Sequence, residues 1–208
     1  MSTGEGRKNA KPAGRVGGGA VARLKAEVAG LQAQLEATRL ALAEAERLAD
    51  QDPLAPVANR RAFIRELGRM QAFSHRHQMA TSLIYLDING FKQINETLGH
   101  AGGDAALNHV VALLLANVRQ SDVVGRLGGD EFGLILSGAS LASAVDKSDH
   151  LCRAISDTPF IWQGENIRLG IAAGAADVLG ASTPEQVISA ADQAMFTHKR
   201  QQRGLFDQ

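Results

Sequence analysis

Three acidic residues could form one catalytic site, because they adjoin strand-like sequence at two separate places. Asp87 comes directly after a short apolar run that has the composition of a buried strand. Asp130 and Glu131 follow Gly128 and Gly129 in a turn between two further strand-like runs. If these strands are neighbours in one sheet, the three carboxylates lie close together.

The chemistry that suits such a cluster is transfer of a phosphoryl or nucleotidyl group. Crowded carboxylates repel each other unless a divalent cation or a proton compensates. Mg²⁺ prefers hard oxygen ligands and commonly holds substrate phosphates at its remaining positions. Gly128 and Gly129 would let the backbone approach a triphosphate without a Cβ in the way. The same four residues also fit a solvated turn, so the turn by itself leaves both interpretations open.

The chain divides by composition into three parts. Residues 1–20 are basic and rich in glycine, which predicts a disordered tail. Residues 21–51 carry apolar or small side chains at alternating spacings of three and four, typical of a coiled-coil helix. Residues 52–208 form the globular domain, which begins at Asp52-Pro53, where the residue before proline leaves the helical region. The coiled-coil seam consists of Val21, Leu24, Val28, Leu31, Leu35, Thr38, Leu42, Ala45 and Ala49.

This seam needs a covering surface, because the rest of the helix is polar. A parallel homodimer would provide one, since the spacing keeps its register over four heptads. The alternative is a single amphipathic helix that folds back on its own domain. Thr38 and the two alanines weaken the C-terminal half of the seam.

The domain is predicted to be α+β, with a central, mainly antiparallel sheet flanked by helices. Asn59 is the expected N-cap of its first helix, and the two glycines before Asp130 predict a tight hairpin with positive φ angles. After that first helix the expected order is βααββαβα. Strands are expected at 82–86, 123–127, 132–136, near 160 and at 167–173. Helices are expected at 141–156 and 184–202, and also after residue 90 and at 104–119, with breaks between these last two at Gly99 and at Gly102-Gly103.

Composition limits the partners and the compartment. The 208 residues carry 22 basic and 22 acidic side chains, so no net charge points to a nucleic acid or a membrane surface. No apolar run is long enough to span a membrane. The basic N-terminus lacks the apolar segment of a secretion signal. The one cysteine, Cys152, forms no intrachain disulfide, which favours the cytoplasm.

Five sequence blocks, in order, resemble the GGDEF domain of diguanylate cyclases over about residues 50–204. The signature itself is Gly128-Gly129-Asp130-Glu131-Phe132. The other blocks are Asp52-Pro53-Leu54 with Asn59-Arg60-Arg61-Ala62-Phe63, the stretch 87–96, its continuation 99–104, and Ala191-Asp192 with Lys199 and Arg203. The resemblance implies a nucleotidyl-cyclase-like fold with a βααββαβ core, preceded here by the coiled-coil helix.

The resemblance also implies roles for individual residues. Asp87, the carbonyl of Ile88 and Asp130 would hold Mg²⁺ or Mn²⁺, with Glu131 supporting the metal or the phosphates. Asn95 and Asp104 would recognise the edge of guanine, whose donors and acceptor an amide and a carboxylate can satisfy together. Lys199 and Arg203, one helical turn apart, would face the phosphates as cations.

The implied reaction joins two GTP molecules into cyclic di-GMP and releases pyrophosphate. Each domain would hold one GTP, so two domains must face each other, and the seam would keep them together. Arg119 and Asp122 stand where the family has an R-x-x-D site at which the product inhibits the enzyme. Taken alone, this pair would be an ordinary surface ion pair.

The match departs from the family at Ala55-Pro56-Val57-Ala58, where Thr-Gly-Leu-Pro is usual, and this puts signal coupling in question. The main alternative is a catalytically silent domain that binds GTP or cyclic di-GMP as a receptor. Such domains typically lose the signature acids, which this chain keeps. A third reading is a coiled-coil scaffold whose N-terminal region recruits a protein partner. No sensor domain is recognisable.

Overall fold

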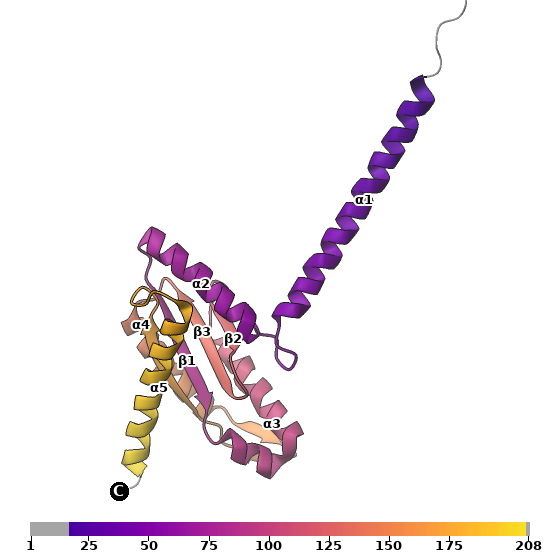
Figure 1. Cartoon of the computed structure of the whole chain (residues 1–208). Coiled ribbons are helices and arrows are strands. Elements are labelled where there is room, and N and C mark those ends of the chain that lie inside the picture. The colour runs from indigo at the N-terminus through magenta and orange to yellow at the C-terminus, as the bar shows by residue number, and fades with distance from the viewer. Residues whose placement is uncertain (1–16, 207–208) are drawn as a thin grey trace, which may run out of the picture. The chain divides into compact units, whose positions relative to one another are not determined.

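The computed structural model describes the backbone of residues 17–206 and the side chains of residues 19–45 and 49–200. The chain forms two compact units, Met1–Ala49 and Asp50–Gln208 (Figure 1). The first sixteen residues of the predicted tail lie outside the described residues.

The described part of the first unit is one helix, α1 (Gly17–Asp50). It begins four residues before the predicted start, because glycine only weakens a helix that the alanine-rich sequence after it propagates. The seam residues Val21, Leu24, Val28, Leu31 and Leu35 are each 50–59% exposed. The helix is therefore confirmed, and its apolar seam is open to solvent in the single chain. No helix in the described part of the chain is both long enough and apolar enough to cross a membrane.

The second unit is built on a four-stranded antiparallel sheet with the strand order β2-β3-β1-β6. This confirms the α+β fold with a mainly antiparallel sheet. The strands are β1 (Thr81–Ile88), β2 (Val123–Arg126), β3 (Glu131–Ser137) and β6 (Ile171–Asp177), and β4 (Phe160–Trp162) pairs with β5 (Glu165–Ile167) in a separate hairpin.

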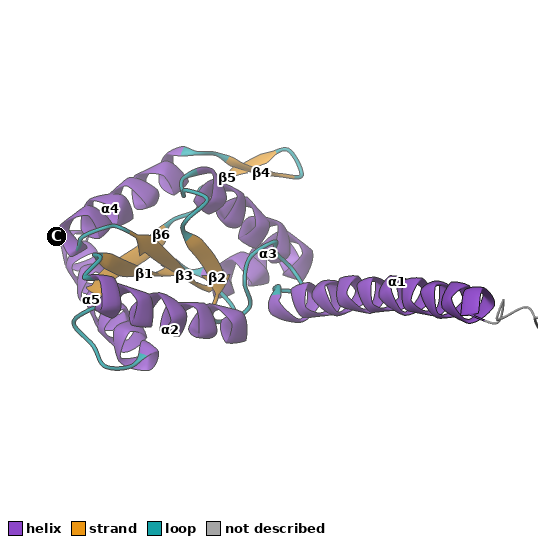
Figure 2. Cartoon of the chain, turned by 90° about the horizontal axis from the view of Figure 1, so that it is seen from above, coloured by secondary structure: helices purple, strands orange, loops and turns teal. Residues whose placement is uncertain are grey.

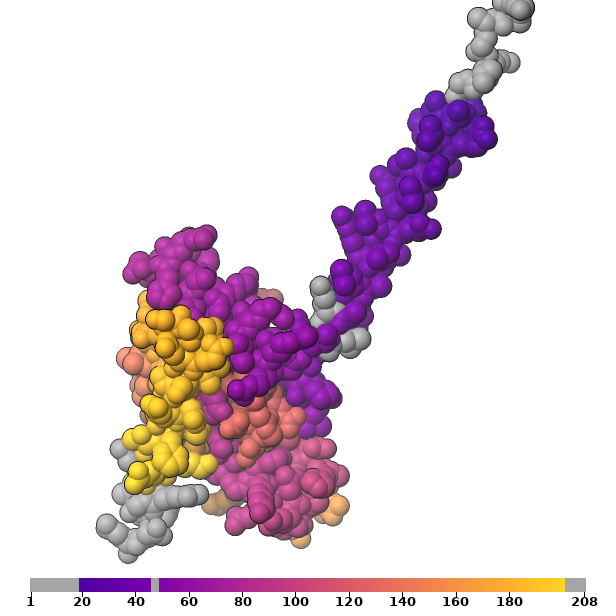
Figure 3. Space-filling view, viewed as in Figure 1, coloured from indigo at the N-terminus to yellow at the C-terminus, as the bar shows by residue number. Residues whose placement is uncertain are grey.

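Helices cover both faces of this sheet (Figure 2). The helices α3 (Phe91–Ala116) and α4 (Leu141–Asp157) lie on one face, while α2 (Arg60–His77) and α5 (Pro184–Phe206) lie side by side on the other (Figure 3). Strand β1 contributes alternate residues to the two cores, Ile84 and Leu86 to the first and Leu83 and Tyr85 to the second. Asp87 therefore points to the same side as Tyr85, toward α5.

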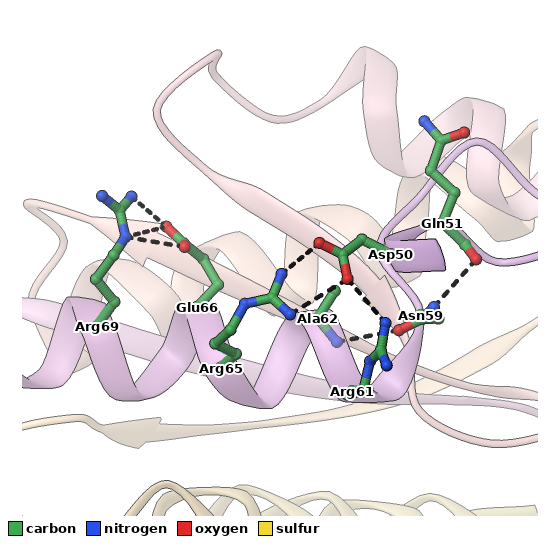
Figure 4. Close-up of polar contacts among 8 residues, drawn as sticks. All are labelled: Asp50, Gln51, Asn59, Arg61, Ala62, Arg65, Glu66 and Arg69. Atoms are coloured by element: carbon green, nitrogen blue, oxygen red, sulfur yellow. Dashed lines mark hydrogen bonds and ion pairs between the residues drawn. The ribbon is translucent and has the colours of Figure 1, made fainter. Parts of the chain in front are cut away.

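The start of α2 is fixed by the segment that precedes it (Figure 4). The side chain of Asn59 accepts a hydrogen bond from the Ala62 N–H at 3.0 Å, which confirms the predicted N-cap. The Asn59 amide group also donates to the Gln51 carbonyl at 3.2 Å. Arg61 and Arg65 both bind the carboxylate of Asp50, and the hydrogen bond from Arg65 is the main cause that lowers its pKa.

The segment that departs from the family pattern is nevertheless packed against the domain. Ala55 and Val57 are buried in the core beneath α3 and α4. The Ala58 N–H donates to the Val124 carbonyl at 3.0 Å, and the Arg126 N–H donates to the Ala58 carbonyl at 2.8 Å. Ala58 thus pairs with β2 at the edge of the sheet, while Ala55 and Val57 fill the core.

The structure of α3 confirms one of the two predicted breaks and lacks the other. It bends once, at Gly99 (φ 74°, ψ 170°), and stays helical through Gly102 and Gly103, where a second break was expected. Both of these glycines are buried, and a Cβ on Gly102 would come within 2.4 Å of the Leu98 side chain. Close packing, which outweighs the low helix propensity of glycine, explains why the helix continues. It ends at Ala116, three residues before the predicted end. The chain from 160 onward also differs, because the expected strand 167–173 is split between β5 and β6.

Phe63 fills a space that two glycines leave on the sheet. Gly125 and Gly133 are direct partners across β2 and β3, and Phe63 is fully buried. A Cβ on either glycine would lie 2.5 Å from an atom of the Phe63 ring. The ring therefore packs directly on the backbone of the strands that flank the signature turn.

Candidate active site

The pairing of β1 with β3 brings the acidic residues together. Asp87 and Glu131 are direct partners in the antiparallel register. The Ile88 N–H donates to the Asp130 carbonyl at 3.1 Å, so Asp130 lies beside the end of β1. The structure thus confirms that these segments, far apart in sequence, adjoin at one end of the two inner strands.

Gly128 serves a different purpose in the turn from the one predicted. Neither Gly128 nor Gly129 has a positive φ, so the turn is not of the primed type. The N–H groups of Leu127 and Gly128 both donate to the Glu131 carbonyl, at 2.8 and 3.3 Å. A Cβ on Gly128 would lie 2.1 Å from Oε2 of Glu131, so the glycine makes room for this carboxylate. A Cβ on Gly129 would meet no described atom within 4 Å.

Two arginines hold the carbonyls of this turn. Arg60, at the start of α2, donates to the Leu127 carbonyl at 2.7 Å. Arg126 donates to the Gly129 carbonyl at 2.7 and 3.2 Å and to Asp52 Oδ1 at 3.1 Å. Asp52 in turn accepts the N–H of Leu54 at 3.0 Å. These contacts join residues that no sequence pattern pairs. Arg60 stands within a block that resembles the family, but nothing in the sequence says which carbonyl it binds.

The charges at the site are only partly balanced. Lys199 of α5 forms an ion pair with Asp87, and both side chains are mostly buried. Burial and the neighbouring Asp87 carboxylate raise the pKa of Asp130, against the opposing effects of Lys199 and Arg126. Tyr85 is buried beside Glu131, and burial together with a hydrogen bond to that carboxylate raises the pKa of the phenol. Additional positive charge would therefore stabilise the ionised carboxylates of the site.

The carboxylates present fit Mg²⁺ bound together with a substrate. Within the described residues, no group of three or more His, Cys, Asp or Glu side chains is arranged to hold a metal ion. Mg²⁺ is commonly bound through one or two carboxylates and completes its shell with water and phosphate oxygens. The raised pKa of Asp130 beside Asp87 marks the place where a cation would relieve repulsion.

The two residues expected to recognise guanine are brought near each other by α3. The Asn95 side chain lies against Gly103, where a Cβ would come within 1.9 Å of Asn95 Oδ1. Asp104 is the next residue and is exposed. Gly103 thus allows Asn95 to approach the helical turn that carries Asp104.

The remaining predicted residues fall in two other places. Arg203 lies in α5, but its side chain is outside the described residues. Arg119 and Asp122 lie in the loop between α3 and β2. The Asp122 carboxylate accepts the N–H of Ser137 at 3.3 Å, at the end of β3 opposite to Glu131. At roughly 3.3 Å per residue, β3 separates the two sites by about 20 Å.

The sequence of the chain matches one protein family and several curated proteins. Residues 49–204 match the family described as "Diguanylate cyclase, GGDEF domain". The probable diguanylate cyclase DgcE of Escherichia coli K12 is 37% identical over 158 residues, which cover 75% of this chain but only 14% of that relative.

Two solved structures resemble both units of the chain. One is the coiled coil and GGDEF domain of DgcB from Caulobacter crescentus in complex with c-di-GMP, with a TM-score of 0.76 and 27% identity, covering 85% of this chain and 94% of that one. The other is the diguanylate cyclase SiaD of Pseudomonas aeruginosa in complex with its activator SiaC. It has a TM-score of 0.72 and 28% identity, and the match covers 87% of this chain and 68% of that one.

The crowding of Asp130 predicts how stability depends on pH. In metal-free buffer at pH 7, Asp130→Asn should raise the free energy of unfolding, because it removes a charge that the folded state disfavours. The advantage should shrink as the pH falls through the raised pKa. It should vanish below the ordinary value of 3.8, where Asp130 is protonated in both the folded and the unfolded chain. Urea denaturation with EDTA at several pH values measures this difference.

The control for that measurement is Asp146→Asn, which changes an exposed carboxylate on α4. It should alter stability by no more than about 0.5 kcal/mol. Equal effects of the two substitutions at every pH would show that Asp130 is not electrostatically crowded.

Proposed function

The chain belongs to the GGDEF-domain family of diguanylate cyclases, and we propose that it condenses two GTP molecules into cyclic di-GMP and pyrophosphate. The observation that carries this proposal is the register of β1 and β3, which aligns Asp87 with Glu131 and places Asp130 beside both. A silent receptor domain would have no need to keep these repelling carboxylates together.

The acidic residues would serve the phosphates of GTP. Asp87, the Ile88 carbonyl and Asp130 would hold Mg²⁺ or Mn²⁺, with Glu131 in support at the same end of the two strands. The metal, when bound, would neutralise charge on the reacting phosphate oxygens and lower the pKa of the attacking hydroxyl. Lys199 would exchange its ion pair with Asp87 for contacts with the β and γ phosphates, and Arg203 lies one turn further along α5.

The reaction occurs twice between the same two nucleotides. The 3′-oxygen of one GTP forms a bond to the α-phosphorus of the other, and the bond from that phosphorus to pyrophosphate breaks. The proton of the hydroxyl passes to a base, and Asp130 is suited to accept it because burial and Asp87 raise its pKa. Asn95 and Asp104 would select guanine by hydrogen bonding to its edge.

Two copies of the domain are needed, because each holds a single GTP. The open seam of α1 would pair with that of a second chain and raise the effective concentration of one domain near the other. Cyclic di-GMP would inhibit the enzyme by binding Arg119 and Asp122, the site about 20 Å away along β3.

The cytoplasm, where GTP is available, is the proposed compartment. SiaD is known in complex with an activator protein. By analogy, the N-terminal region of this chain would be a place for a protein partner to act.

Incubation of the purified chain with GTP and Mg²⁺, followed by chromatography, tests the proposed activity. We expect cyclic di-GMP and pyrophosphate from the native chain. Asp130→Ala should lower the rate by about a hundredfold or more, because it removes both a metal ligand and the proton acceptor. Glu165→Ala, an exposed residue in the β4–β5 hairpin, is the control and should keep the native rate. A dimer that binds GTP and yields no product would instead favour the receptor function.

Disruption of the seam tests the dimer. The double variant Leu31→Lys, Leu35→Lys should sediment as a monomer, because it places charges at two seam positions. Its rate per chain should then increase with protein concentration. Leu40→Lys changes an exposed leucine outside the seam, so this control should remain dimeric and active. A dimer that survives the double variant would show that the seam is not the interface.

A further inference from the structure

The proposed product site is part of a pocket that extends to a residue the R-x-x-D motif does not contain. This pocket of about 210 Å³ opens between the loop after α3, the end of β3 and the first turns of α4. Arg119 and Asp122 line one side, and Ser143 and Lys147 of α4 line the other. It is smaller than the roughly 300–1,000 Å³ of ordinary ligand sites. The pocket therefore accommodates one part of a dinucleotide, such as a base or a phosphate.

The carboxylate of Asp122 is held in a fixed position by the backbone. It accepts the N–H of Arg119 at 2.8 Å and the N–H of Ser137 at 3.3 Å. The Asp122 N–H in turn donates to the Arg119 carbonyl at 3.0 Å, which closes the turn. Each carboxylate oxygen retains a second lone pair. The motif thus presents a rigid acceptor to a ligand.

The two cations of the pocket differ from Asp122, whose carboxylate is held by the backbone. In the part of the chain whose side chains are described, neither the Arg119 guanidinium nor the Lys147 ammonium has an ion pair or a hydrogen bond. Lys147 is half-buried rather than fully solvated. Together with Asp122, these groups give the pocket a net charge of about one positive unit.

The charges of the ligand require a second cation. A cyclic dinucleotide carries two phosphodiester groups, each with one negative charge. Arg119 and Asp122 together are neutral, and an arginine that stacks on a base or forks onto its edge is used for base recognition. The pair alone therefore leaves the phosphates without a counter-charge at this site.

We propose that Lys147 binds a phosphodiester of the product in this pocket and thereby sets how strongly the product inhibits the enzyme. This inference rests on the proposed function, since it names a further ligand-binding residue of the product site. An ammonium suits the role, because it is a compact point charge on a flexible stem that can follow a phosphate oxygen. Arg119 and Asp122 would recognise the base, and Lys147 the backbone of the dinucleotide.

Calorimetric titration of cyclic di-GMP into the full chain tests this role. Lys147→Met keeps the length of the side chain and removes its charge, so it should weaken binding about tenfold or more. Lys147→Arg keeps the charge and should retain most of the affinity. Arg153→Met removes a cation from an exposed position of the same helix, outside the pocket lining, and should bind as the native chain does.

Arg119→Ala separates failure of this inference from failure of the proposed product site. Loss of binding in Arg119→Ala with native affinity in Lys147→Met would overturn the role of Lys147 and leave the product site standing. Equal weakening by Lys147→Met and Lys147→Arg would also overturn it, since the charge would not matter. Native affinity in both Arg119→Ala and Lys147→Met, or no binding by the native chain, would remove the product site itself.

Discussion

The antiparallel register between β1 and β3 is the constraint on which the rest of the site depends. It aligns Asp87 with Glu131, and a shift of one residue would turn Asp87 to the opposite face, toward α3 and α4. The register is fixed by burial, because alternate residues of β1 enter two different cores. The cost is a set of carboxylates that repel each other, which Lys199 offsets in the free chain and a bound cation would offset in the complex.

The shape of the signature turn depends on close packing and hydrogen bonds, and not on positive φ angles at its glycines. Gly128 leaves room for the Glu131 carboxylate, while Arg60 and Arg126 hold carbonyls on either side of the turn. Arg126 also binds Asp52, so the turn shares a hydrogen-bond network with the segment that leads into the domain. The Arg126 guanidinium thus links that segment directly to the turn.

Local features of this fold were predictable from sequence, and long-range ones were not. The Asn59 cap, the strand that ends at Asp87 and the heptad helix depend on neighbours within a few residues, so pattern and propensity suffice. The ion pair of Lys199 with Asp87 joins residues 112 positions apart, and no local pattern announces it. Gly102 and Gly103 misled the prediction because their role is close packing within α3. The GGDEF resemblance supplied the candidate site residues, but not the arginines that support the turn.

The measurement that tests the central claim most directly is binding of Mn²⁺ by electron paramagnetic resonance. It would use the full chain with 3′-deoxy-GTP, which cannot condense because it lacks the attacking hydroxyl. Mn²⁺ bound beyond that held by the free nucleotide should be present in the native chain and lost in both Asp87→Asn and Asp130→Asn. Undiminished Mn²⁺ binding in both variants would contradict the claim that the β1–β3 register builds a metal site.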